Sequence, residues 1–306
     1  MGVTRRGTGA VLALAGAALL AFAYARPLTV FEAWAALRLR LAGVRSGHVQ
    51  AGPYRLHYLE AGSGPPLVLV HGLASNATQD WGRLIGPLSR QFHVYAPDLP
   101  GFGRSERPPD ADYSIPMQVE AVRAFMDAKG VRRARVAGIS MGGWIAARLA
   151  GESPERVERL VLVDAAGMRP DGPAIPAEAL LPRDEEGVRR LAAVVRHNAP
   201  VPPSFVARDI LSRRLREEWV VRRALESMRD GEDWLNGTLG RADMPVLVVW
   251  GKQDRLIPVA YAARLQAEFP RAELAVLDGC GHVPIADCPE AFDRVLVPFL
   301  DAADAP

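Results

Sequence analysis

The sequence has 306 residues, of which 49% are hydrophobic and 24% are charged. These proportions are those of ordinary globular proteins, and they exclude a disordered chain, a collagen-like or coiled-coil fibre and a polytopic membrane protein. Lysine and arginine total 37 against 35 acidic residues, and this balance does not favour a nucleic-acid partner. The two cysteines, Cys280 and Cys288, are too few for a disulfide framework. We expect two free thiols, and the alternative is a disulfide between them in an oxidising compartment.

The chain begins with an apolar stretch, residues 7–25, that carries no charge and is flanked by Arg5, Arg6 and Arg26. A helix of this length rises about 28 Å, which is close to the roughly 30 Å hydrocarbon core of a bilayer. We therefore expect residues 1–26 to be a membrane anchor and the protein to associate with a bacterial inner membrane. One alternative is an exported protein with a cleaved signal peptide, because Ala-X-Ala sequences end the stretch. A helix packed on the domain is the other alternative, and it is disfavoured because the stretch has no polar face.

Residues 27–46 are expected to form an amphipathic lead-in helix, either at a membrane interface or on the protein's own core. The apolar positions that recur at helical spacing are Val30, Phe31, Trp34, Leu37 and Leu41.

From residue 47 the pattern changes to short apolar runs that alternate with helical segments. A predicted hairpin at 49–59 is followed by runs at 67–70, 92–96, 134–137, 160–163, 246–250 and 274–277. Most runs are unbroken, as is typical of strands buried on both faces of a parallel sheet, and the alternation with helices predicts a doubly wound α/β fold.

One interval, residues 166–243, is far longer than the usual connection of roughly 2 to 6 residues. It contains helical patterns at 184–197, 204–214 and 215–229, so we expect a helical cap inserted into a core formed by residues 47–165 and 244–306.

Ser140 lies in the sequence Gly138-Ile139-Ser140-Met141-Gly142-Gly143, between a predicted strand and a predicted helix. A serine hydroxyl becomes a nucleophile only when a tight turn holds it exposed beside a base. Glycines two residues before and after Ser140 remove side chains that would collide in such a turn. The motif in this context predicts a catalytic serine.

Six histidines are candidates for the base, and His282 is the strongest. It follows the last predicted strand in Gly279-Cys280-Gly281-His282, where a loop at the carboxyl edge of the sheet faces the serine loop. His71 also ends a strand, but it precedes the serine, and a structural role in the loop 71–73 fits it better.

The acid that orients the histidine is expected to end a strand between Ser140 and His282. Asp254 follows the strand 246–250, and Asp164, which ends the strand before the cap, is the competing candidate. With Asp254 the chain order is serine, acid, histidine. The backbone N–H groups of Met141 and Leu73 are then the expected oxyanion donors. No metal or organic cofactor is predicted, because the chain has no HExxH sequence and no G-x-G-x-x-G that opens a helix after a strand.

Together these motifs resemble the α/β-hydrolase superfamily over residues 48–300. The resemblance rests on His71-Gly72, the run 98–105, the serine motif, Trp250-Gly251-Lys252-Gln253-Asp254 and Gly281-His282. It implies a mostly parallel eight-stranded sheet with helices on both faces and a cap between strands 6 and 7. Within the superfamily the chain is most similar to membrane-anchored monoacylglycerol lipases, which implies hydrolysis of esters of single-chain glycerolipids. It departs from them in Asp287-Cys288-Pro289, after the histidine loop, and in an arginine-rich cap.

Apolar cap residues are candidates for an acyl pocket, with packing among themselves as the alternative. They are Phe205, Ile210, Leu211, Trp219, Val220 and Trp234. The expected partner is therefore a small ester or lipid, and the sequence does not indicate an oligomeric state. Carbon–carbon bond hydrolysis and cofactor-free perhydrolysis are alternative reactions of the same triad. A non-catalytic binding protein is disfavoured because no triad member is missing.

Overall fold

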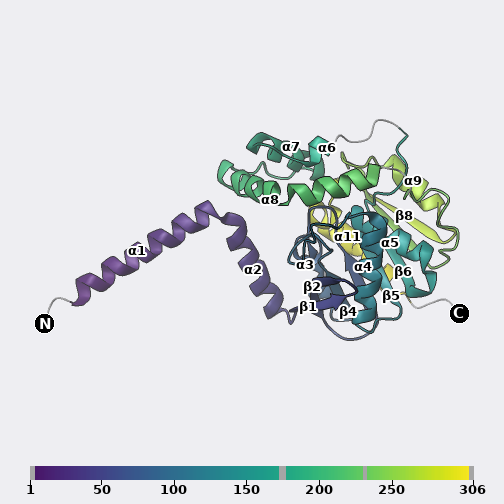
Figure 1. Cartoon of the computed structure of the whole chain (residues 1–306), viewed down its shortest axis with the longest axis horizontal. Coiled ribbons are helices and arrows are strands. Elements are labelled where there is room, and N and C mark those ends of the chain that lie inside the picture. Colours follow the sequence, from purple (N-terminus) through teal and green to yellow (C-terminus); the bar gives the residue numbers. More distant parts are fainter. Residues whose placement is uncertain (1–3, 172–176, 230–232, 303–306) are drawn as a thin grey trace.

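The computed structural model describes residues 4–171, 177–229 and 233–302; the side chains of residues 4–14, 177 and 178 lie outside the description. Its eight-stranded sheet has the strand order β1-β2-β4-β3-β5-β6-β7-β8 (Figure 1). Strand β2 runs antiparallel to its neighbours β1 and β4, and all other neighbouring pairs are parallel. The predicted α/β fold with a mostly parallel sheet is confirmed. The strands are β1 (Arg45–Ala51), β2 (Tyr54–Ala61), β3 (Pro66–Val70), β4 (His93–Pro97), β5 (Ala134–Ile139), β6 (Val157–Val163), β7 (Val246–Gly251) and β8 (Ala272–Leu277).

Helices cover both faces of the sheet, and side chains that alternate along the strands pack against them. In β3, Leu67 and Leu69 belong to the apolar cluster that contains residues of α3 and α11. Val68 and Val70 point to the opposite face and join the cluster that contains residues of α4, α5 and α9. Burial on both faces explains why the strands lack polar alternation. These helices are α3 (Ala77–Leu88), α4 (Ile115–Ala128), α5 (Met141–Glu152), α9 (Ala260–Ala267) and α11 (Pro289–Asp301).

The long segment between β6 and β7 contains α6 (Ala177–Leu180), α7 (Glu185–Val195) and α8 (Ser204–Arg229). These helices lie together along one side of the molecule, at the top of Figure 1. The stretches 204–214 and 215–229, expected as separate helices, form the single helix α8, because neither glycine nor proline interrupts them. Parts of the predicted cap, residues 172–176 and 230–232, lie outside the described residues.

Two helices precede the sheet, α1 (Thr4–Ala25) and α2 (Pro27–Leu41). Figure 1 shows α1 extending away from the body of the molecule and α2 returning to it. No helix in the described part of the chain is long and apolar enough to cross a membrane. This finding corrects the prediction of an inner-membrane protein anchored by residues 1–26.

Helix α2 packs on the core by a narrower face than its apolar spacing predicts. Leu39 is buried in the cluster with α3. The five positions of the predicted apolar stripe are exposed, namely Val30, Phe31, Trp34, Leu37 and Leu41. Helix α2 ends at Leu41 rather than at residue 46, and the predicted stripe does not pack on the protein's own core.

The start of α2 is fixed to the inserted segment by Asp209 of α8. The Asp209 side chain is almost completely buried, and its Oδ2 accepts a hydrogen bond from the backbone N–H of Leu28 at 3.0 Å. The N-terminal N–H groups of a helix have no partner within the helix, so Asp209 caps α2 from a distant part of the chain. Nearby, Arg213 pairs with Glu32, and the rings of Tyr24 and Phe205 stack at 5.0 Å.

We predict that Asp209→Ala loosens this attachment, because the substitution removes the acceptor for the Leu28 N–H. The expected loss is about 1 kcal/mol of unfolding free energy, as for other helix caps, with faster amide exchange at the start of α2. Hydrogen–deuterium exchange measures the effect, and the exposed Arg216→Ala on the same helix is the control. Equal exchange in the two variants would show that Asp209 does not hold α2.

The junction of β5 and α5 is so tight that two of its glycines cannot carry a side chain. A Cβ on Gly142 would lie 2.3 Å from the carbonyl oxygen of Val70, and one on Gly138 would lie 2.1 Å from that of Gly142. Helix α5 therefore begins directly against the end of β3, and Ser140 is at the tip of the turn between the two glycines.

We predict that Gly142→Ala destabilises the fold by about 1 to 3 kcal/mol, since backbone oxygens cannot move away as a flexible side chain can. Gly82→Ala is the matched control within a helix, because its Cβ would meet its nearest neighbour, the Thr78 methyl, at an ordinary 3.7 Å. That variant should be neutral or stabilising by up to about 1 kcal/mol. Urea unfolding compares the two, and similar stabilities would contradict the tight junction.

Candidate active site

Ser140 occupies a backbone conformation that non-glycine residues rarely adopt, with φ of 56° and ψ of −121°. Its N–H donates to the carbonyl of Val163 at 2.9 Å, and its own carbonyl accepts from Gly143 and Ala166. Such strain persists only where surrounding contacts enforce it, and it is typical of functional turns. The partly exposed hydroxyl is thereby held at the carboxyl end of β5, in the middle of the sheet.

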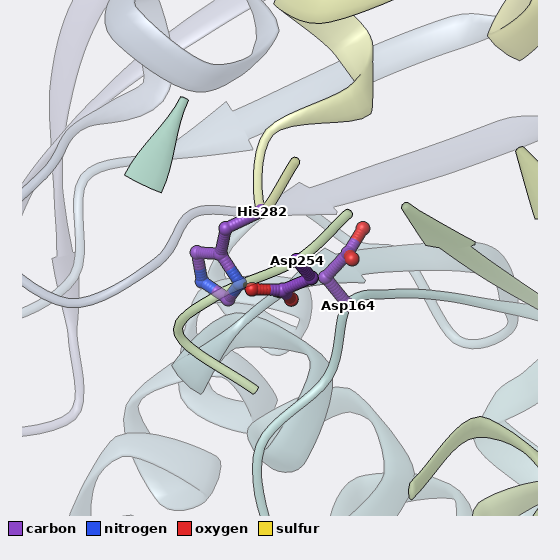
Figure 2. Close-up of side chains that lie close together, drawn as sticks. All are labelled: Asp164, Asp254 and His282. Carbon is purple, nitrogen blue, oxygen red and sulfur yellow. Dashed lines mark hydrogen bonds and ion pairs between the residues drawn. The ribbon is translucent and has the colours of Figure 1, made fainter. Parts of the chain in front are cut away.

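Asp254 and His282 come from the loops after β7 and β8 and form a buried pair. His282 Nδ1 lies 2.8 Å from Asp254 Oδ2, and only 4% of His282 and 7% of Asp254 are exposed. Figure 2 shows the carboxylate of Asp254 pointing at the imidazole. The other oxygen, Oδ1, accepts the backbone N–H groups of Leu256 and Ile257 at 2.7 and 2.9 Å. An ionised carboxylate can only accept, so Nδ1 carries the proton and Nε2 keeps its lone pair.

Among the described side chains, none forms a hydrogen bond with the Ser140 hydroxyl, His282 included. Catalytic hydrogen bonds are often long in unliganded enzymes and tighten when substrate binds. The structure therefore places the three predicted residues at one edge of the sheet and joins two of them directly.

Two backbone amides beside Ser140 remain available to a ligand. Within the described residues, neither Met141 N–H nor Leu73 N–H donates to another protein group. The loop that carries Leu73 approaches the serine closely, since a Cβ on Gly72 would lie 3.3 Å from the Ser140 Cβ. Both donors expected from the sequence are thus free and lie on elements next to the serine, as an oxyanion site requires.

His71 holds the loop that carries Leu73. Its Nε2 accepts the Leu99 N–H at 2.9 Å, which leaves Nδ1 protonated to donate to the Gly72 carbonyl at 2.8 Å. The ring is completely buried. This arrangement agrees with the structural role expected for His71 and leaves it no free nitrogen to act as a base.

Asp164, the competing acid, ends β6 and lies beside the Asp254–His282 pair. One oxygen or nitrogen atom from each of Asp164, Asp254 and His282 lies within 4.8 Å of the others. Figure 2 shows Asp254 with His282 on one side and Asp164 on the other. Burial, reinforced by the negative charge of Asp254, raises the pKa of Asp164 well above its ordinary value. The carboxylate that contacts the imidazole is Asp254, as expected.

The same three groups are the cluster in the described chain whose atoms could converge on a metal ion. Several of their atoms, however, already form hydrogen bonds with one another or with backbone amides. Asp254 accepts three hydrogen bonds, and Asp164 Oδ1 accepts the Gly251 N–H at 2.9 Å. This pattern is typical of a proton-sharing site.

The loop of His282 is braced by a disulfide, which was the less favoured alternative for the two cysteines. Cys280 and Cys288 are bonded, with their Cα atoms 5.8 Å apart, so the expectation of two free thiols is wrong. The short helix α10 (Pro284–Asp287) turns the chain back and brings the two cysteines together. The spacing of eight residues could not reveal this turn.

Asp287 adds a second brace, which also connects the His282 loop to the inserted segment. Its Oδ2 accepts the N–H groups of Gly281 and His197 at 2.9 and 2.8 Å, and Arg196 pairs with it. The backbone N–H of His282 itself donates to the Val195 carbonyl at 3.0 Å. The end of α7 therefore helps to position the histidine.

The predicted acyl-pocket residues have varied surroundings. The ring of Trp219 packs edge-on against Tyr113, while Trp234 stacks on Trp144 at 5.1 Å. Phe205 stacks on Tyr24 of α1, away from the serine turn. Val220 is fully buried, whereas Ile210 and Leu211 are partly exposed on α8. The role of these side chains in binding an acyl chain stays a prediction.

Comparison with known proteins identifies the family. The chain matches the family model described as alpha/beta hydrolase fold over residues 65–199 and 197–289. A solved structure described as a membrane phospholipase A, a bacterial virulence factor, is 33% identical, has a TM-score of 0.84 and shares 98% coverage of both chains.

Two curated relatives represent different reactions. A 2-hydroxymuconate semialdehyde hydrolase of Pseudomonas putida is 32% identical over 84% of this chain and 94% of its own length. Lipase 3 of a Moraxella species is 29% identical over 74% of each chain. The chain therefore belongs to the α/β-hydrolase family, and it is a serine hydrolase.

Proposed function

We propose that this protein hydrolyses carboxylic esters of glycerolipids, monoacylglycerols among them, through a covalent acyl-enzyme. The observation that carries the proposal is the buried Asp254–His282 hydrogen bond, which lies at the same sheet edge as the strained Ser140 turn. Ser140 is the nucleophile, His282 the general base, and the N–H groups of Met141 and Leu73 are the oxyanion donors.

In the first half-reaction, Ser140 Oγ attacks the ester carbonyl carbon while His282 Nε2 takes the hydroxyl proton. The carbonyl oxygen becomes an oxyanion, and the two free amides stabilise it. Asp254 keeps the imidazole in the tautomer with Nδ1 protonated and stabilises the imidazolium. The imidazolium then gives its proton to the departing alcohol, and the acyl group stays on Ser140.

In the second half-reaction, water attacks the acyl-enzyme and His282 accepts a proton from it. Collapse of the second tetrahedral intermediate releases the fatty acid and returns the proton to Ser140. Each step uses the same free amides and the same imidazole face, so one arrangement of groups serves both halves.

A lipid substrate is supported by how far the similarity extends. The membrane phospholipase A structure matches 98% of this chain, so its alignment includes α1 and α2 almost entirely. Structures of the carbon–carbon bond hydrolases match 83–85% of the chain. Their alignments therefore leave out a part of the chain at least as large as α1 and α2 together. The exposed apolar residues of α2 also suit a lipid substrate better than a small polar one.

Carbon–carbon bond hydrolysis is the second candidate, because the Pseudomonas putida hydrolase is as similar in sequence as any lipase named above. Both reactions would use the same serine, acid and histidine. Activity measured on the two kinds of substrate therefore distinguishes the two candidate functions.

We predict that Ser140→Ala and His282→Ala each lower kcat/KM for ester hydrolysis by about 10³-fold or more while the protein stays folded. Asp254→Asn should cost about 10³- to 10⁴-fold, since the amide favours the wrong imidazole tautomer. Asp164→Asn should be mild. Initial rates on a soluble ester measure all four.

The exposed Ser204→Ala is the control, and a fluorophosphonate should label every variant except Ser140→Ala at some rate. Near-full activity of Ser140→Ala or His282→Ala would refute the triad. A severe Asp164→Asn with a mild Asp254→Asn would move the acid to Asp164.

We predict that kcat/KM rises with acyl length across a series of esters and that monoacylglycerols are turned over, with Ser140→Ala as the blank. Medium or long acyl chains bury more apolar surface, and each buried CH₂ contributes about 0.8 kcal/mol at most. Activity confined to short esters, or turnover of a 2-hydroxy-6-oxodienoate with none of esters, would favour the small-molecule reading.

A further inference from the structure

The backbone of Asp164 has an unfavourable conformation. It is a non-glycine residue with φ of 41°, and its side chain is completely buried. Its N–H donates to the Val249 carbonyl and its Oδ1 accepts the Gly251 N–H, both at 2.9 Å. Strain of this kind at a buried polar residue calls for an explanation beyond packing.

The second oxygen of Asp164 supplies that explanation. Oδ2 is buried, and in the described part of the chain no hydrogen bond reaches it. A buried acceptor without a donor is costly, but the same atom becomes satisfied if it carries a hydrogen and donates it. The acceptor within reach is the carboxylate of Asp254.

Asp254 has room for one more donor. Its Oδ1 already accepts two backbone N–H groups, whereas Oδ2 accepts only from His282 Nδ1. A carboxylate oxygen has two lone pairs, so one position on Oδ2 is free. An ionised Asp164 would instead bring a second negative charge against Asp254 without water to screen either.

We propose that Asp164 is protonated at neutral pH and donates its Oδ2 hydrogen to Asp254, so that the two acids share one negative charge behind His282. Asp164 is then a positioning residue that fixes the Asp254 carboxylate and limits its negative charge. The use of this pair in catalysis rests on the proposed function, whereas the protonation of Asp164 does not.

Other charged groups around the pair act in the same direction. Asp287 of α10 is a further acid that raises the pKa of Asp164, after burial and the charge of Asp254. Its own charge is paired with Arg196. The imidazole of His282 contacts Asp254 rather than Asp164, and Asp164 Oδ1 accepts its hydrogen bond from the Gly251 amide.

The first test needs no activity. The infrared spectrum of the full-length protein at pH 7 should contain the carbonyl stretch of a protonated, buried carboxylic acid. Asp164→Asn should remove this band, and the exposed Asp243→Asn should not. An unchanged carbonyl region in Asp164→Asn would overturn the proposal, even if the protein hydrolysed no ester at all.

The second test compares pH profiles of kcat/KM for an ester substrate. Asn keeps a neutral hydrogen-bond donor in place and tolerates a positive φ. The kcat/KM of Asp164→Asn should therefore stay within about threefold of the wild-type value, and the acid limb of its pH profile should not move. Asp164→Gly also tolerates the backbone but loses the donor. The kcat/KM of this variant should be about tenfold or more below that of the wild type. The acid limb of its pH profile should move to higher pH, because the imidazolium then faces an unshared negative charge on Asp254.

An ionised Asp164 predicts the opposite pattern. Asp164→Asn would then remove a negative charge near the imidazole and move the acid limb to lower pH, and that result would overturn the proposal. If Asp164→Gly does not fold, the pH profile and the infrared spectrum of Asp164→Asn still decide whether Asp164 is protonated. If no variant and no wild type hydrolyses esters, the proposed function fails while the infrared result stands.

Discussion

The hydrogen bond between Asp254 and His282 joins two loops that follow separate strands, and it is only possible because parallel strands end at a common edge of the sheet. Asp254 follows β7 and His282 follows β8, the last two strands in the sheet order. Ser140 ends β5, two strands away from β7. Three residues that are far apart in sequence and that we propose as nucleophile, base and acid thus lie at one edge of the sheet without any one loop having to be long.

An imidazole on a loop needs restraint in order to keep one orientation, and this chain supplies it from two directions. The disulfide between Cys280 and Cys288 closes the histidine loop on itself. Asp287 and the Val195 carbonyl connect that loop to the end of α7. The orientation of His282 therefore depends on contacts with the inserted segment as well as on its own loop.

The sequence predicted those features whose signals are local. Ser140 is recognisable because the strand, the glycines and the helix are consecutive, and β7 and β8 are apolar runs that end immediately before Asp254 and His282. The free thiols were favoured over the disulfide because the sequence does not show the turn made by α10, which brings the two cysteines together. The attachment of α2 to Asp209 was missed because the two residues are 181 positions apart. The N-terminal apolar stretch was assigned to a bilayer because composition alone does not distinguish the environments of a helix.

The contacts of the N-terminal and inserted helices were harder to predict from the sequence than the sheet. The sheet and its edge residues are shared by hydrolases of esters and of carbon–carbon bonds, so the triad cannot choose between them. The inserted helices and the two N-terminal helices lie outside the sheet, and α1 and α2 contact α8 directly through Tyr24, Leu28 and Glu32. Helix α7 packs beside α8, and its last residue, Val195, accepts the backbone N–H of His282. A continuous series of contacts therefore connects the N-terminal helices, through the inserted segment, to the proposed base.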